Sequence, residues 1–171
     1  MRRVRYAVAI SLDGYLAGPQ GEIDWIAHDP EVDFASPAAE FDAMLVGRKT
    51  YDFARARGMS VRMPGIDPYV LSSTLQQAEC PDATVSADAR STVSGLKAKA
   101  GKDIWLFGGG LLFRSLLDLG LVDTVEVAII PVLLGSGVPL LPERGARAQL
   151  RLVRQRTYSR TGRVSLEYEV A

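Results

Sequence analysis

Residues 104–110 have the sequence IWLFGGG, in which four apolar residues run directly into three glycines. An uninterrupted apolar run of this length is typical of a strand that is buried on both faces of a parallel sheet. Residues 111–119 then predict a helix, which Gly120 ends. A strand that passes through glycines into a helix indicates an α/β fold, in which ligands bind beyond the carboxyl ends of the strands.

The rest of the sequence repeats this alternation. Strands are predicted at residues 4–12, 43–46, 69–71, 83–87 and 124–134. Helices are predicted at 34–42, from the loop 47–50 to about residue 56, and at 90–100. The N-cap of this last helix is either Asp88 or Ser91. Segments 149–158 and 163–170 flank a short turn and predict an antiparallel hairpin. We therefore expect one domain over residues 1–171, with a mixed, mostly parallel sheet flanked by helices and a C-terminal antiparallel hairpin.

Composition excludes several classes of protein. The 171 residues contain 20 basic and 20 acidic side chains, so no net charge attracts the protein to nucleic acid or anionic lipid. No apolar stretch approaches the roughly 20 residues of a membrane span. The single cysteine, Cys80, permits no internal disulfide, and His28 has no companion ligands for a metal. We expect a cytoplasmic protein that binds no metal, nucleic acid or membrane.

Three apolar strands end in small, polar loops: residues 46–50 (VGRKT), 71–73 (LSS) and 108–110 (GGG). Glycine allows a ligand to approach the backbone closely, and the amides at the start of a helix bind anions. Taken singly, each loop is also explained by a tight turn or by the end of a strand. Together, on successive strand ends, they predict an extended cofactor that carries phosphate groups.

Charge is unevenly distributed along the chain. Residues 7–46 contain eight acidic side chains and no lysine or arginine, whereas residues 144–171 contain seven arginines. A ligand that rests on the acidic segment should offer hydrogen-bond donors, not phosphates or carboxylates. The alternative is that both segments are solvated faces without a ligand.

The order and spacing of several motifs resemble the dihydrofolate reductase fold, and in particular the reductase domain of bacterial riboflavin biosynthesis and its stand-alone relatives. The motifs are SLDGYLA at 11–17, Asp24-Trp25, VGRKTY at 46–51, LSS at 71–73, FGGG at 107–110 and PVLLGSG at 131–137. The resemblance covers nearly the whole chain. It implies NADPH as the hydride donor, in a homodimeric enzyme whose copies meet through the terminal strands.

The resemblance also assigns roles to residues. The cofactor-binding residues it implies are Gly47, Arg48, Lys49 and Thr50 at the phosphates, Ser72 and Ser73 beside the adenosine half, and Gly108, Gly109, Gly110, Leu111 and Leu112 under the pyrophosphate and nicotinamide. Asp13 and Trp25 are expected on the substrate side. Glu31 and Asp33 are the candidate catalytic acids, although both are equally explained as loop caps or solvated side chains.

Two departures from these families concern the substrate. Folate reductases carry an arginine after a Pro-Gly pair, where this chain has Ile66. Riboflavin reductases carry an acid before the glycine loop and basic residues near 35–42, whereas this chain has Phe107 and no base there. We expect an NADPH-dependent reductase of a small pterin-like or pyrimidine-like heterocycle other than these two substrates. The alternative is a non-catalytic nucleotide-binding module.

Overall fold

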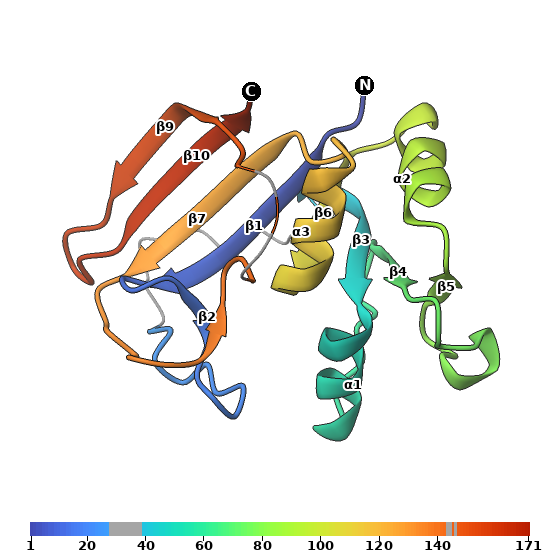
Figure 1. Cartoon of the computed structure of the whole chain (residues 1–171), viewed down its shortest axis with the longest axis horizontal. Coiled ribbons are helices and arrows are strands. Elements are labelled where there is room, and N and C mark those ends of the chain that lie inside the picture. Colours follow the sequence, from blue (N-terminus) through green and yellow to red (C-terminus); the bar gives the residue numbers. More distant parts are fainter. Residues whose placement is uncertain (28–38, 143–144, 146) are drawn as a thin grey trace.

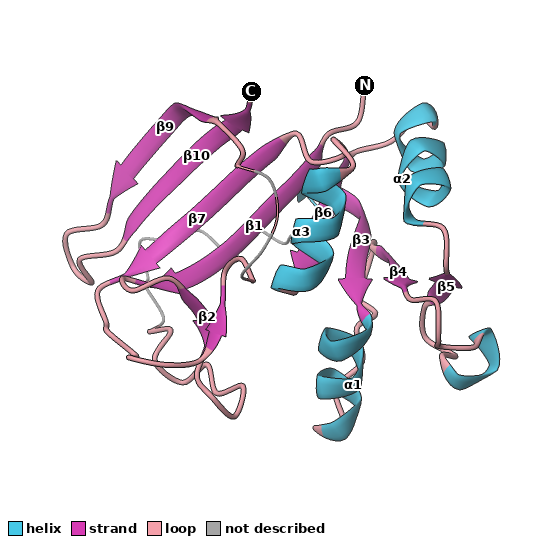
Figure 2. Cartoon of the chain, viewed as in Figure 1, coloured by secondary structure: helices cyan, strands magenta, loops and turns pink. Residues whose placement is uncertain are grey.

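The computed structural model describes residues 1–27, 39–142, 145 and 147–171. Its strands are β1 (Val4–Ser11), β2 (Tyr15–Ala17), β3 (Phe41–Gly47), β4 (Asp67–Leu71), β5 (Thr84–Ser86), β6 (Asp103–Gly108), β7 (Thr124–Ile130), β8 (Val138–Pro139), β9 (Leu150–Thr157) and β10 (Val164–Val170). Its α-helices are α1 (Arg48–Ala56), α2 (Ala89–Ala98) and α3 (Gly110–Asp118), and Gln77–Glu79 form a short 3₁₀ helix (Figure 2). None of the helices in these ranges is long and apolar enough to cross a bilayer.

The main sheet has the strand order β5-β4-β3-β6-β1-β7-β10-β9. All pairs from β5 to β7 are parallel, and β10 is antiparallel to both of its neighbours. Figure 1 shows the β9–β10 hairpin at one end of the sheet and β4 and β5 at the other. The predicted α/β fold, with its mostly parallel sheet and C-terminal antiparallel hairpin, is confirmed. A consequence is that the carboxyl ends of six neighbouring strands lie at one edge.

One face of the sheet packs against α3. The rings of Tyr6 on β1 and Phe113 on α3 are stacked with centroids 3.9 Å apart, and Leu106 and Leu116 belong to the same buried cluster. A second buried cluster lies around α1, with Tyr51 as its largest fully buried side chain. These two clusters fix the positions of the helices whose first residues follow β3 and β6.

Strand β6 differs from its prediction. Ile104 and Leu106 are buried on the α3 side, whereas Trp105 and Phe107, which alternate with them, are only half-buried among the described residues. The Trp105 indole donates to the Ala7 carbonyl at 3.1 Å and stacks on Phe41. The expected burial on both faces is therefore complete only on the α3 side, because Trp105 and Phe107 on the other side pack at the margin of the cluster around α1 and stay partly exposed.

Three element boundaries also differ from prediction. Of the helix expected at 34–42, residues 34–38 lie outside the described residues, and Phe41 and Asp42 belong to β3. Strand β4 begins two residues earlier than predicted and includes Pro68, which pairs with β3. The pairing of β4 with β5 starts only at Tyr69, so that side of the ladder needs no N–H from the proline. Strand β7 stops at Ile130, since the proline that follows lacks an N–H for the ladder.

Candidate functional site

The loops after β3 and β6 are in direct contact at the carboxyl edge of the sheet. A Cβ atom placed on Gly47 would lie 3.4 Å from Leu112 Cβ and 3.7 Å from the Gly108 carbonyl oxygen. A Cβ atom on Gly109 would lie 3.3 Å from Thr50 Oγ1. Two of the three predicted cofactor loops therefore form one surface, and glycine keeps their backbones accessible.

Helices α1 and α3 both begin on this surface. Their N-caps are Gly47 and Gly109, and in the described chain neither N-terminus has a side-chain cap or an acidic residue in its first turn. The first N–H groups of each helix are therefore available to a ligand, and both helix dipoles present their positive ends. Such a pair of N-termini is suited to bind an anion, including a diphosphate.

Arg48 connects this surface to the third loop, after β4. Its Nε donates to Asp52 Oδ2 at 2.7 Å, and its NH1 lies 3.5 Å from Thr74 Oγ1. The hydrogen bond to Asp52 raises the pKa of Arg48 above its already high value, so the guanidinium stays charged. Ser72 Oγ shapes the same turn by accepting from the Thr74 and Leu75 amides. Lys49 and Ser73 are exposed beside them.

Asp13, predicted on the substrate side, is engaged within the chain. Its carboxylate accepts from Ser11 Oγ at 2.6 Å, from the Leu134 amide at 3.1 Å and from the Gly135 amide at 2.7 Å. These hydrogen bonds lower the pKa of Asp13, and the bond from Ser11 has the largest effect. The carboxylate is thus a fixed acceptor between two loops, and contact with a substrate stays a prediction.

Trp25 lines a hollow of about 200 Å³ at the carboxyl end of β7. The other lining residues come from the chain after Trp25, from the end of β7 and from the β9–β10 turn: Ala27, Ile130, Pro131, Val132, Thr161 and Arg163. The indole Nε1 donates to the Glu22 carbonyl at 3.1 Å, which fixes the ring. The hollow is mainly apolar and carries one cationic side chain, Arg163, among its lining residues.

The two candidate acids, Glu31 and Asp33, lie outside the described residues. Sequence reasoning also missed participants. Arg163 was grouped with the solvated arginines, and only the fold places it at the hollow beside Trp25. Tyr51 belongs to the VGRKTY motif, and its hydroxyl donates to Asp82 Oδ1 at 3.0 Å, which fixes the start of α1. No pattern in the sequence predicts this contact.

Comparisons with known proteins agree with this architecture. Residues 2–162 match the RibD C-terminal domain. The uncharacterized protein YyaP of Bacillus subtilis (strain 168) is 33% identical over 178 residues, which cover 98% of this chain and 94% of that protein.

Two solved structures share the fold. A putative riboflavin biosynthesis protein from Shewanella sp. PV-4 has a TM-score of 0.81 at 24% identity, covering 100% of this chain and 99% of that one. Dihydrofolate reductase from Enterococcus faecalis, complexed with NADP(H), has a TM-score of 0.70 at 17% identity, covering 98% and 96%. These likenesses confirm the dihydrofolate reductase-like fold, and the match over residues 2–162 shows that this chain belongs to the RibD C-terminal domain family.

Proposed function

We propose that the protein is an NADPH-dependent reductase of a small heterocycle. The observation that carries the proposal is the pair of uncapped helix N-termini, α1 and α3, with Arg48 beside them at adjacent strand ends. Membership of the RibD C-terminal domain family supports a reductase role. The NADP(H) bound in the Enterococcus faecalis reductase supports a nicotinamide cofactor on this fold.

The residues present fit NADPH, which supplies a hydride when bound. The first amides of α1 and α3 would hold the diphosphate, because Gly47, Gly108 and Gly109 leave the backbone open to it. Arg48 would bind the 2′-phosphate, with Lys49 adding charge from the surface. Leu111 is an exposed apolar side chain on the first turn of α3, and it would shield the nicotinamide from water.

The substrate would lie between the nicotinamide and the hollow at Trp25. Phe107, which meets Trp105 edge to face, offers an apolar ring edge and no charge next to the glycine loop. The Phe107 side of this surface favours an uncharged ring, in agreement with the absence of basic residues from positions 7–46, whereas the hollow carries the cationic Arg163. The departures at Ile66 and Phe107 continue to disfavour folate and the phosphorylated riboflavin intermediate as substrates. Either Glu31 or Asp33 is proposed to donate the proton that accompanies hydride transfer.

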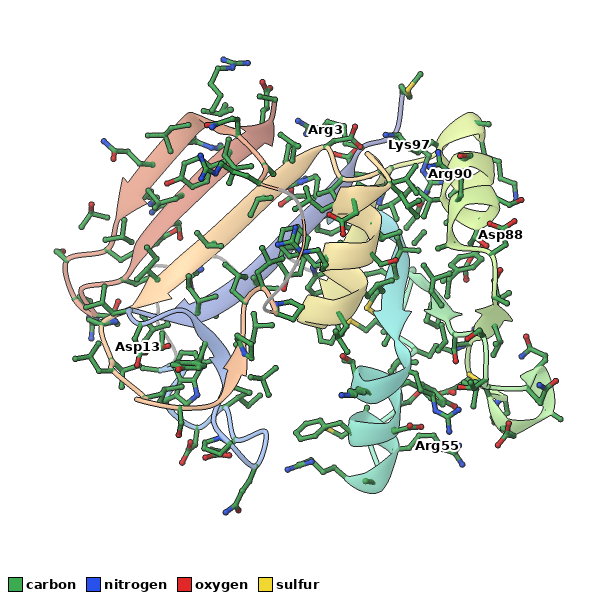
Figure 3. All side chains as sticks on the ribbon, in the orientation of Figure 1. Arg3, Asp13, Arg55, Asp88, Arg90 and Lys97 are labelled. Carbon is green, nitrogen blue, oxygen red and sulfur yellow. The ribbon has the colours of Figure 1, made fainter. Side chains whose placement is uncertain are left out.

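The test is a fluorescence titration of the protein with NADPH and with NADH. We expect Arg48→Ala to weaken NADPH about 10- to 100-fold, the scale of one charge-assisted hydrogen bond, and to leave NADH within about twofold. Arg3→Ala is the matched control, because Arg3 is exposed just before β1, at the opposite ends of the parallel strands from Arg48 (Figure 3). Failure of the wild type to bind either nucleotide would overturn the proposal.

A panel of pterins, pyrimidines and quinones then separates the two candidate functions. NADPH oxidation with any of them supports the reductase. Tight NADPH binding without oxidation of the cofactor by any member of the panel would favour a non-catalytic nucleotide-binding module.

We also propose that the protein is a homodimer that pairs through the β9–β10 hairpin. Every residue of β9, the edge strand, is exposed, including Leu150, Leu152 and Val153. The charges of Arg151 and Arg154 are matched within the chain by acids on β10, so the apolar side chains are left to attract a second copy. Light scattering should show a dimer that Leu152→Glu dissociates, and a monomeric wild type at micromolar concentration would contradict it.

A further inference from the structure

Residues 132–140, here called the strap, are fastened to the loop that follows β1. The Leu12 amide donates to the Val132 carbonyl and the Leu140 amide donates to the Gly14 carbonyl, both at 2.9 Å. Strand β2 pairs with β8 inside the strap. These contacts join two segments more than 100 residues apart into one unit at the carboxyl edge of the sheet.

Asp13 is the side chain that holds the middle of the strap. Its carboxylate accepts from the Leu134 and Gly135 amides on one side and from Ser11 Oγ on the other. Ser11 is fully buried, and its Oγ also accepts from the Tyr15 amide at 2.9 Å. The carboxylate is therefore bound to the buried end of β1, and Figure 3 shows Asp13 beside β2.

The far end of the strap reaches the cofactor surface. A Cβ atom on Gly110 would lie 2.9 Å from the carbonyl oxygens of Pro139 and Leu140, so the strap runs against the first turn of α3. Two apolar side chains flank Asp13 and its partners: Leu12 is 62% exposed and Leu133 is 70% exposed. The strap therefore meets the first turn of α3 through its backbone and carries exposed apolar surface near Asp13.

We infer that Asp13 is a positioning residue, which holds the strap where it encloses the nicotinamide half of NADPH. This inference rests on the proposed function. It divides the proposed cofactor site into a nicotinamide half, which depends on Asp13, and an adenosine half, which does not. The proposed adenosine contacts follow β3 and β4, whereas Asp13 follows β1. From β4 to β1 there are three interstrand spacings, about 14 Å. Loss of Asp13 should therefore affect one half of the cofactor and spare the other.

The experiment compares two ligands by calorimetry: NADP⁺, and 2′,5′-ADP, which lacks the nicotinamide half. We expect Asp13→Ala to weaken NADP⁺ about tenfold, because part of the binding free energy must then order a strap that has lost its tether, and to change 2′,5′-ADP less than about twofold. Asp13→Asn keeps one oxygen acceptor and should fall between wild type and Asp13→Ala. Asp24→Asn is the matched control, since Asp24 is an exposed acid in the next connection along the chain, after β2.

The outcomes separate this inference from the proposed function. A wild type that binds neither ligand overturns both. A wild type that binds both, with Asp13 variants that weaken the two ligands equally or not at all, overturns the positioning role alone. Arg48→Ala provides the comparison, because it should weaken both ligands. If Asp13→Ala does not fold, the same comparison with Asp13→Asn decides the result.

Discussion

Replacing Tyr6 by phenylalanine removes one hydroxyl group from the centre of the sheet and leaves the ring in place. Tyr6 is 0% exposed, and its hydroxyl has no hydrogen-bond partner among the described residues. The ring keeps its stacking on Phe113, since both aromatic planes are unchanged by the substitution. We therefore expect Tyr6→Phe to increase the free energy of unfolding.

The magnitude follows from the cost of an unsatisfied buried polar group, which is about 1–3 kcal/mol. Taking the lower end, we expect a gain of about 1 kcal/mol, or a rise in Tm of about 2–4 °C for a chain of this length. Tyr51→Phe is the matched control. Tyr51 is 1% exposed, but its hydroxyl donates to Asp82, so its loss should cost about 1–2 kcal/mol.

Urea unfolding of the wild type and both variants measures the difference. Near pH 7, a Tyr6→Phe variant less stable than wild type would refute the reasoning, because it would show that the hydroxyl has a partner, such as a buried water. Burial raises the pKa of Tyr6 far above its ordinary value of about 10. The unfolded chain then loses this proton first as pH rises above about 10, and stability falls. Tyr6→Phe lacks this contribution, so its stability should fall less steeply.

Four further substitutions test contacts within the fold. Gly110→Ala places a methyl group against two backbone carbonyls of the strap and should cost about 2 kcal/mol in thermal unfolding; Gly95→Ala, in the open interior of α2, should instead stabilise by about 0.5–1 kcal/mol. Glu126→Gln weakens the main ion pair of the buried Arg5 and should cost about 2–3 kcal/mol in urea unfolding. Asp88→Ala removes the N-cap of α2, and calorimetry should show a loss of about 1 kcal/mol.

The elements that were predictable are those specified by neighbouring residues. The apolar run before Gly108 and the turn at 159–162 are local signals, and both lead to the strands expected from them. Asp88 was one of two N-cap candidates for α2, and the structure selects it through its bond to the Ser91 amide. Turn chemistry and capping act over a few residues, so a single sequence contains them.

The parts that could not be predicted depend on contacts between distant segments. Asp13 stood in a motif, but its partners at Leu134 and Gly135 are 121 and 122 residues away. The same is true of Arg163, which meets the Trp25 hollow only because β10 pairs with β7. Phe41 was assigned to a helix by its neighbours, and its packing on Trp105 places it in β3. Tertiary packing outweighs local propensity at such positions.

This contrast divides the candidate site into two halves with different origins. The proposed cofactor half is built from strand–glycine–helix units, each continuous in sequence, and sheet order only has to make β3 and β6 neighbours. The proposed substrate half is assembled from the loop after β1, the strap and the β9–β10 turn, which no continuous segment contains. Side chains such as Trp25 and Arg163 can therefore change without disturbing the helix N-termini. A fold of this kind can keep one cofactor while its substrate varies, which is why the residues here define the proposed cofactor more sharply than the substrate.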